Sequence, residues 1–290
     1  MSRNWNHNRE NDRSGSSRQI AQVKEKYEIV MSGKEFNNFK PDMLKNKKIN
    51  LGLYLNKYSI RFGDDKKFDL KEQINKILDN QNKLRLPASI FDLDSYSSYY
   101  NRFLRFCESL KSQGYHVEGI EPGISWRLLI GLGGESVYET SITLHRNYSV
   151  PIIPGSAVKG ITRAYAKKEK LNKEIEIEIF GNDENKNLSQ GKVVFFDAFP
   201  VIEKNNKEFL VLDIMNVHYK EYYEGKYQQP GDWMNPVPIN FLATEGLRYR
   251  FMIASKDEKL AKESIKLLKG ALKYGIGAKT SSGYGYFDIA

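Results

Sequence analysis

Four glycines, one lysine and three hydroxyl side chains lie together near the end of the sequence. The glycines are Gly275, Gly277, Gly283 and Gly285, and among them stand Lys279, Thr280, Ser281 and Ser282. Glycine permits positive φ angles and lets backbone N–H groups approach a ligand closely, and successive N–H groups can form a concave site for an anion. The lysine adds a positive charge at the same place. We therefore expect a loop that binds phosphate; a turn that merely closes a small sheet is the alternative.

Two familiar phosphate-binding patterns do not fit this loop. A P-loop carries a glycine directly before its Lys-Ser/Thr pair and a second glycine five residues earlier, but here these positions hold Ala278 and Lys273. A dinucleotide-binding fingerprint opens a βαβ unit, and the sequence that follows the loop is too short to form one. The missing P-loop pattern argues against an enzyme that acts on a small phosphorylated molecule.

A second stretch, residues 154–170, combines the start of a helix with basic side chains. We expect Ser156 to cap this helix, because a serine there can accept a hydrogen bond from a free N–H group of the first turn. The outward stripe of the helix consists of Lys159, Arg163, Lys167 and Lys170. A helix N-terminus attracts anions, although such a stripe can also be an ordinary solvated face. Gly160 costs about 1 kcal/mol relative to alanine inside a helix, which indicates close approach by another group.

The histidines decide whether the chain could carry out general acid–base catalysis. His145, followed by Arg146, is the best candidate, but such catalysis needs a positioned partner and the sequence offers no clear second one. The remaining histidines are His7, His116 and His218. Asp197 could bind a metal, yet no His/Cys or Asp/Glu cluster has the spacing of metal ligands. We therefore expect no catalytic residue, no metal site and no cofactor.

Composition restricts the class of protein further. The chain has 290 residues, a net charge of +9 and a pI near 9.2, which favour a polyanionic partner. Its single cysteine, Cys107, allows no internal disulfide and fits a reducing compartment. The N-terminus is polar rather than apolar, and no apolar run approaches the roughly 20 residues of a membrane span. We expect a cytoplasmic protein that does not enter a membrane.

The first part of the chain has few strand signals. Residues 1–26 are polar and basic, and we expect them to be disordered. Residues 27–115 read as mainly helical: Asp69 is a plausible N-cap, and a longer helix after Asp94 ends at Gly114. Its aromatic stripe is formed by Tyr96, Tyr100, Phe103, Cys107 and Leu110. These side chains could stack on bases, but helical spacing favours a core face.

Residues 116–290 alternate between strand and helix patterns. Strands are expected at 125–131, 192–198, 209–214 and 247–253, helices at 156–170 and 257–273, and a last strand after the glycines. Residues 217–244 lack periodicity and are expected to form a long irregular insertion that contains one hairpin strand. This order indicates an α+β protein with a modified ferredoxin-like, or split βαβ, fold. One face of such a sheet stays open, as in RNA-recognition (RRM-like) folds.

Several motifs carry a resemblance to a known family. Residues 154–163 (PGSAVKGITR) and 275–285 (GIGAKTSSGYG) are similar to the RAMP superfamily of CRISPR effector proteins. Within it, residues 139–146, 213–223 and 232–238 resemble the family of sixth subunits of type III-B (Cmr) complexes. The resemblance extends from about residue 120 to the end. It implies a RAMP ferredoxin-like domain at residues 116–290, preceded by the helical region.

The resemblance also implies a function and partners. It implies a structural subunit of a ribonucleoprotein for antiviral defence, near the 3′ end of the guide RNA (crRNA), with target cleavage assigned to another subunit. The implied partners are crRNA, target RNA, the backbone RAMP subunit, the small helical subunit and the other head RAMP subunit. The residues assigned to RNA contact are Ser156, Lys159, Arg163, His145, Arg146, Gly275, Gly277, Lys279, Thr280, Ser281, Gly283 and Gly285. The alternative is a metal-independent endoribonuclease of the same superfamily that processes guide RNA with His145.

Overall fold

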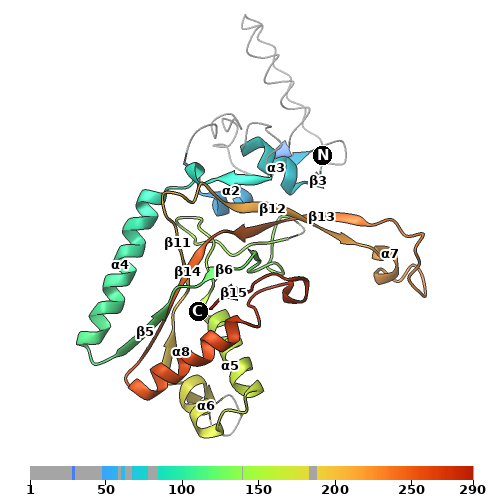
Figure 1. Ribbon diagram of the computed structural model, residues 1–290. Coiled ribbons are helices and arrows are strands. Elements are labelled where there is room, and N and C mark those ends of the chain that lie inside the picture. Colours follow the sequence, from blue (N-terminus) through green and yellow to red (C-terminus); the bar gives the residue numbers. More distant parts are fainter. Residues whose placement is uncertain are drawn as a thin grey trace, which may run out of the picture.

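The computed structural model describes residues 28–29, 48–57, 60–62, 67–77, 84–138, 140–182 and 188–289. The basic tail predicted for residues 1–26 lies outside this part of the chain. The described residues form two main antiparallel sheets with helices packed against them (Figure 1). The α+β class predicted from the sequence is therefore confirmed.

The larger sheet is built around strand β14 (Arg248–Ser255). On one side β14 pairs with β5 (His116–Ile120) and β6 (Gly123–Ile124), and on the other with β10 (Val193–Phe195) and β11 (Phe199–Val201). The last strand, β15 (Phe287–Asp288), pairs with β6. The alternation of apolar and polar residues at 247–253 predicted β14. In the structure every second side chain, at Tyr249, Phe251 and Ile253, is fully buried, because successive side chains of a strand point to opposite faces.

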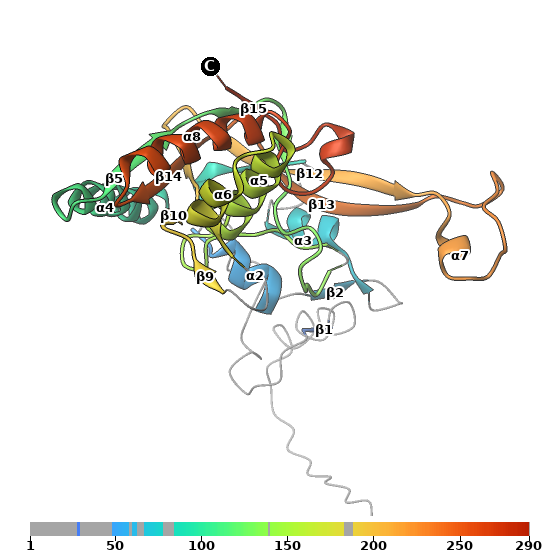
Figure 2. The same cartoon turned by 90° about the horizontal axis from the view of Figure 1, so that it is seen from below.

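Helices cover both faces of this sheet. The helices α5 (Gly155–Lys168), α6 (Lys173–Phe180) and α8 (Glu258–Leu272) lie together, and α4 (Leu93–Ser112) lies apart from them (Figures 1 and 2). Phe195 stacks on Phe180 of α6, whereas the next residue, Phe196, contacts Phe103 of α4. Adjacent residues of a strand point to opposite faces, so α4 covers the face that the ferredoxin-like pattern was expected to leave open.

The smaller sheet contains a long hairpin. Its strand order is β4 (Arg85–Pro87), β12 (Glu208–Val217), β13 (Val237–Glu245) and β7 (Arg127–Leu128). Pairing of β12 with β13 runs from Leu210↔Thr244 to Val217↔Val237, and the short helix α7 (Lys220–Tyr223) lies at the tip. The distal part of this hairpin arm, residues 208–245, points away from the body of the molecule (Figures 1 and 2), whereas Phe209, Leu210 and Phe241 near its base are buried. The insertion is thus more regular than expected, and the single hairpin strand predicted within it is β13.

The strand predicted at residues 125–131 is interrupted. β6 ends at Ile124, β7 comprises only Arg127 and Leu128, and Ser125 and Trp126 lie between them. The two short strands belong to different sheets, because β6 pairs with β14 and β7 with β13. A single apolar run therefore links the two sheets instead of forming one continuous strand.

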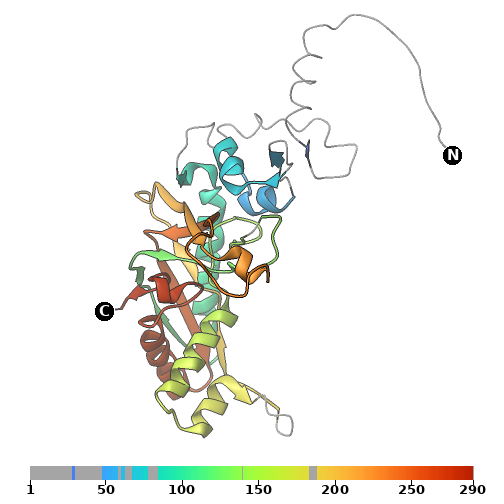
Figure 3. The same cartoon turned by 90° about the vertical axis from the view of Figure 1, so that its right-hand side faces the viewer.

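The N-terminal elements lie at the opposite end of the molecule from α5 and α6 (Figure 3). They are α2 (Leu51–Lys57), α3 (Leu70–Ile77), the 3₁₀ helix η3 (Ala88–Ile90), and the strands β1 (Glu28–Ile29), β2 (Ile60–Phe62) and β3 (Lys67–Phe68). α3 begins as predicted, because the Asp69 carboxylate accepts a hydrogen bond from the N–H of Glu72 (3.0 Å). α4 begins at Leu93 with Asp92 as its cap, slightly earlier than the predicted start after Asp94, and the chain turns away at Gly114 with a φ of 81°.

The aromatic stripe of α4 packs into the core, as its spacing predicted. Tyr96 and Cys107 are buried, the Tyr96 hydroxyl donates to the Pro200 carbonyl (2.5 Å), and Phe103 meets Phe199 at 4.8 Å between ring centroids. One core cluster contains residues from before and after residue 115. The packing therefore marks no division at this point, and the domain boundary predicted there stays a prediction. None of the helices in the described residues has the length and apolar character needed to cross a membrane.

Candidate nucleic-acid interface

The glycine-rich loop, residues 275–285, follows α8 as expected. α8 begins after Asp257, whose carboxylate accepts hydrogen bonds from the N–H groups of Lys259 (2.8 Å) and Leu260 (3.2 Å). The loop contains a 3₁₀ turn, η4 (Thr280–Ser282). Positive φ angles occur at Gly275, Gly277, Lys279, Gly283 and Gly285. Glycine adopts such angles without steric cost, so the backbone path explains why glycines recur here.

The inner side of the loop packs against the chain's own backbone. The N–H groups of Ala278 and Gly285 donate to the carbonyl oxygens of Leu129 (2.8 Å) and Arg127 (2.7 Å). A Cβ atom on Gly277 would overlap the Leu129 carbonyl, and one on Gly285 would overlap the Ile276 carbonyl. The close approach that these two glycines permit is therefore made within the chain. Contact between them and RNA stays a prediction.

The outer side of the loop has donors to spare. Within the described part of the chain, the N–H groups of Lys279, Thr280 and Ser281 have no hydrogen-bond partner, and the Lys279 ammonium has no ion-pair partner. Ser281 is exposed, and Lys279 and Thr280 are half-buried. Three successive N–H groups beside one cation are suited to an anion such as phosphate. The predicted chemistry of the loop is thus present on this side of it.

A partly buried ionic network attaches the loop to the smaller sheet. The Arg127 guanidinium pairs with Asp213 of β12, and its Nε lies 3.4 Å from Glu245 Oε2. The Tyr284 hydroxyl donates to Asp213 Oδ2 (2.8 Å), and Arg85 Nη2 lies 2.9 Å from Glu245 Oε1. Two cations face two carboxylates, so the network is neutral and its role is to position the loop.

Protonation in this network is set by burial and hydrogen bonding. Burial alone would raise the pKa of Asp213, but hydrogen bonds from Tyr284 and from the Ile214 N–H, together with Arg127, lower that pKa below its usual range. The pKa of Tyr284 rises to about 12 because its hydroxyl is desolvated and donates to Asp213. At neutral pH, Asp213 is therefore ionised and Tyr284 keeps its proton.

The start of α5 differs from the prediction. Pro154, not Ser156, occupies the N-cap position, and no side chain caps the helix from that position. Instead the N–H of Gly155 donates to Asp197 Oδ1 (2.7 Å), because the chain after β10 brings this carboxylate to the helix end. Ser156 is exposed and leaves its hydroxyl at the surface. The Asp197 carboxylate thus occupies part of the position at the start of α5 where a phosphate was expected.

The basic stripe of α5 is divided between two environments. Arg163 Nε lies 3.5 Å from Glu176 Oε1 of α6, and the Glu176 side chain is 7% exposed. Lys167 and Lys173 also approach this carboxylate, at 3.9 and 3.7 Å. By contrast, Lys159 has no ion-pair partner in the described part of the chain. Arg163 therefore helps to join α5 to α6, and its contact with RNA stays a prediction.

Gly160 lies on the open side of α5. It is exposed, and a Cβ atom there would have no neighbour within 4 Å. No other part of the described chain thus requires this glycine. The space beside it is open, and the close approach by another group that a glycine inside a helix suggested stays a prediction.

The residue directly before the loop, Tyr274, meets the C-terminal end of α5. The Lys168 ammonium lies 3.3 Å from the centroid of the Tyr274 ring, and Tyr165 lies 5.7 Å from the same ring. At 1.5 Å per residue, Ser156 is about 18 Å from Lys168 along the helix. An RNA strand that touches both predicted elements would have to run along α5.

His145 has the surroundings of a packing residue. Its ring stacks on Tyr148 and meets Tyr99, both at 4.9 Å between centroids, and its Nδ1 accepts the N–H of Asn147 (3.2 Å). Burial lowers its pKa, and the nearby Asp197 only partly opposes this effect. Among the described residues, no group of three His, Cys, Asp or Glu side chains could hold a metal ion.

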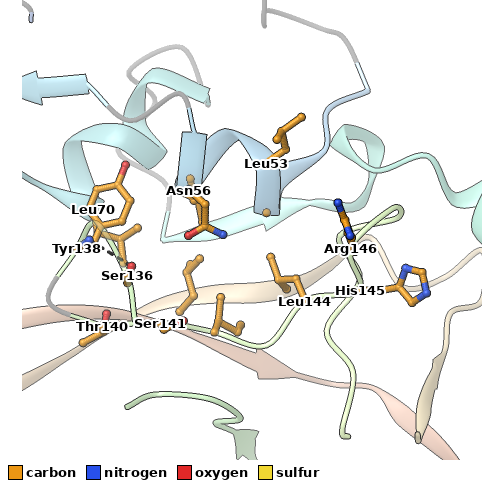
Figure 4. Close-up of a pocket in the computed structure, with 14 residues that line it drawn as sticks. Leu53, Asn56, Leu70, Ser136, Tyr138, Thr140, Ser141, Leu144, His145 and Arg146 are labelled. Atoms are coloured by element: carbon orange, nitrogen blue, oxygen red, sulfur yellow. Dashed lines mark hydrogen bonds between the residues drawn. The ribbon is translucent and has the colours of Figure 1, made fainter. Parts of the chain in front are cut away.

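Arg146 lies beside a cavity of about 370 Å³ between α2 and the segment 136–146 (Figure 4). The walls of this cavity include Leu53 and Asn56 of α2, together with Ser141 and Leu144. The turn that carries Arg146 is attached to α2, because Asn50 Nδ2 donates to the Arg146 carbonyl (2.8 Å). The Arg146 side chain itself is exposed. His145 and Arg146 therefore lie on the side of the molecule formed with the N-terminal helices.

Two features escaped the sequence analysis. Trp126 appeared only as part of a strand, yet its side chain is exposed beside the loop, with its ring 4.9 Å from that of Tyr284. Asp213 appeared only as part of a predicted strand and as the start of a family-like segment, yet it is the carboxylate that holds Arg127 and Tyr284. For Trp126, the signal available in the sequence was an aromatic residue followed directly by arginine.

Comparison with known proteins defines the class. A family model of the RAMP superfamily matches residues 127–288. The chain belongs to this superfamily, and the match includes both the glycine-rich loop and α5.

Closer relatives define the group within the superfamily. The CRISPR system Cmr subunit Cmr6 of Pyrococcus furiosus is 35% identical, over 74% of this chain and 78% of that protein. The Cmr6 subunit of Saccharolobus solfataricus is 28% identical, over 88% of this chain and 86% of that protein. A chain in the cryo-EM structure of the type III-B Cmr-beta complex bound to cognate target RNA is 27% identical, with a TM-score of 0.60 over 76% of this chain and 71% of that one. The chain is thus a member of the Cmr6 subunits of type III-B CRISPR complexes, and the resemblance predicted from its motifs is confirmed.

Proposed function

We propose that this chain is a non-catalytic, crRNA-binding structural subunit of a type III-B CRISPR complex that targets RNA. It lies near the 3′ end of the crRNA and contacts the backbone RAMP subunit, the small helical subunit, the other head RAMP subunit and the target RNA. The complex acts in the cytoplasm. The solved relative that belongs to a Cmr-beta complex bound to cognate target RNA supports this proposal.

One observation carries the proposal: the outer side of the glycine-rich loop holds an unpaired cation beside free N–H groups. Lys279 has no acidic partner among the described residues, whereas the neighbouring Arg127 is neutralised by Asp213. A lysine and backbone N–H groups contact phosphate without reading sequence. That is the recognition needed for a guide RNA whose sequence varies.

The arrangement of the larger sheet supports a modified ferredoxin-like fold. α5 and α8 lie on one face and are packed closely, since a Cβ atom on Gly270 would overlap the Tyr165 ring. Strands β5 and β6 precede α5, and β14 precedes α8, which is the order expected of two βα halves. The addition of α4 to the other face directs RNA to the loop and to the edge beside it.

The surroundings of His145 support a non-catalytic role. An acid–base residue must reach the proton that it transfers, but this ring is packed among Tyr99, Tyr148 and Phe199. Asp197, the carboxylate whose charge acts on His145, accepts the Gly155 N–H instead. The endoribonuclease alternative therefore lacks a positioned partner for His145.

Reconstitution of the complex tests the proposal. The complex would be assembled with crRNA and with wild-type chain, Lys279→Ala, or the control Lys262→Ala, which removes an exposed lysine paired with Glu258. We expect photocrosslinks between the chain and the 3′ part of the crRNA for the wild type and control, and fewer for Lys279→Ala. Crosslinks that map only to the 5′ part, or a complex that holds crRNA equally well without the chain, would overturn the proposal.

A further inference from the structure

An exposed tryptophan stands next to the free side of the glycine-rich loop. Trp126 is 46% exposed although it is one of the largest apolar side chains. Gly283 of the loop faces it, and a Cβ atom added there would lie 3.9 Å from the indole. Since nearly half of the Trp126 side chain is exposed, part of its aromatic surface remains available to a partner.

The indole is held firmly from the protein side. The Tyr284 ring lies 4.9 Å from it, and the Arg127 guanidinium carbon lies 5.0 Å from its centroid. Both supporting side chains bind the same carboxylate, Asp213. The backbone is fixed as well, because the Ser125 N–H donates to the Tyr286 carbonyl (3.0 Å). A stacking surface costs little entropy to use when it is already immobile.

A cation lies within the same loop. The N–H groups of Ser282 and Tyr284 both donate to the Lys279 carbonyl, at 2.9 and 3.3 Å, so the turn brings Lys279 close to the residues that contact Trp126. Its ammonium has no acidic partner in the described chain. An aromatic face beside an unpaired cation is the combination by which single strands are bound, with a base on the ring and a phosphate on the charge.

We propose that Trp126 is a stacking platform for one base of single-stranded RNA whose adjacent phosphate is held by Lys279. This inference rests on the proposed function and deepens it by naming a base-binding residue that acts with the loop. Because every base has a π-face, the platform accepts any base and suits a guide of variable sequence.

Binding of single-stranded RNA to the full-length chain tests the inference. The probes are a short oligouridylate and the same oligonucleotide with abasic positions, and the variants are Trp126→Ala, Trp126→Phe and the control Phe106→Ala. Phe106 lies on α4 and is 48% exposed, close to the 46% of Trp126. We expect Trp126→Ala to weaken binding about 5- to 150-fold, Trp126→Phe to retain most of the affinity, and Phe106→Ala to match the wild type.

Two further readouts separate stacking from charge. The salt dependence of Trp126→Ala should equal that of the wild type, because no phosphate contact is lost, and abasic RNA should weaken the wild type but not Trp126→Ala. If the wild type binds no RNA at low salt, the proposed function fails. If the wild type binds but Trp126→Ala is unchanged, only the stacking inference fails, and weaker assembly of that variant with neighbouring subunits would identify a protein contact instead.

Discussion

Gly277 lies directly against the carbonyl group of Leu129, and this contact decides how the glycine-rich loop is attached. The neighbouring Ala278 donates to that carbonyl at 2.8 Å, and Gly277 has a φ of 91°. A side chain at residue 277 would therefore meet both an unfavourable backbone angle and a backbone oxygen. The glycine serves the fold first and any RNA contact second.

Substitution at Gly277 should lower stability. We expect Gly277→Ala to reduce the free energy of unfolding by about 2 kcal/mol or more, since a strained φ alone costs about 1–3 kcal/mol. Gly160→Ala is the matched control: its site is open and helical, so it should stabilise by about 0.5–1 kcal/mol. Chemical denaturation followed by circular dichroism measures both. Equal stability of wild type and Gly277→Ala would refute the contact.

The Asp213 network should make part of the stability depend on pH. The folded-state pKa of Asp213 is lowered, so its contribution is present above the unfolded pKa of about 3.9 and is lost as pH falls through the folded value. At pH 7 we expect Asp213→Asn to cost about 2 kcal/mol, because a hydrogen-bonded charge pair is removed.

Denaturation of Asp213→Asn and wild type at pH 7 and at pH 2 checks this prediction. The difference in unfolding free energy between the two should shrink at the lower pH. Asp232→Asn, at an exposed position in the hairpin arm, is the control and should match the wild type at both pH values. A difference that stays constant would mean that Asp213 is not ionised in the folded protein.

RNA affinity should depend on salt through Lys159 and Lys279. If each neutralises one phosphate, removing either should flatten the salt slope by about 0.7, and removing both by about 1.4. Arg163→Ala should change the slope less and the stability more, because Arg163 pairs with the buried Glu176. Binding titrations between low and moderate salt measure these slopes. Lys262→Ala is the charge-matched control. An unchanged slope in the double variant would place the RNA elsewhere on the protein.

The purified chain should bind RNA without cutting it. His145→Ala should therefore leave the length of a guide precursor unchanged, while lowering thermal stability through lost packing with Tyr99 and Tyr148. Gel analysis of labelled RNA in the presence of a chelator provides the measurement. Metal-independent cleavage by the wild type that His145→Ala abolishes would establish the endoribonuclease alternative.

The tip of the hairpin arm should be buried in the assembled complex. Tyr223 is 74% exposed and Trp233 is 67% exposed, so the tip presents large aromatic side chains to the surroundings. Aromatic side chains are enriched at interfaces, and we predict that these contact a neighbouring subunit or an unstacked base. Hydrogen exchange of the chain alone and in the complex tests this, with α8 as the internal reference. Unchanged hydrogen exchange at the tip would contradict the prediction, because it would mean that the tip stays exposed in the complex.

Features that depend on neighbours in sequence could be read from the sequence. The Asp69 cap, the strand β14 and the helix α8 follow from local hydrogen bonding and from the period of apolar residues. The glycines of the loop were recognised for the same reason, since a positive φ is a property of one residue. Family membership also followed, because its motifs are short and contiguous.

Features that depend on partners far along the chain appeared only in the tertiary structure. Gly155 is capped by Asp197, Arg163 is paired with Glu176, and the loop rests on Leu129. In each case the sequence showed a free donor, a free cation or a flexible glycine, because the acceptor belongs to another element. The sequence alone thus determined which residues could meet a phosphate, and long-range packing decided which of them remain free to do so.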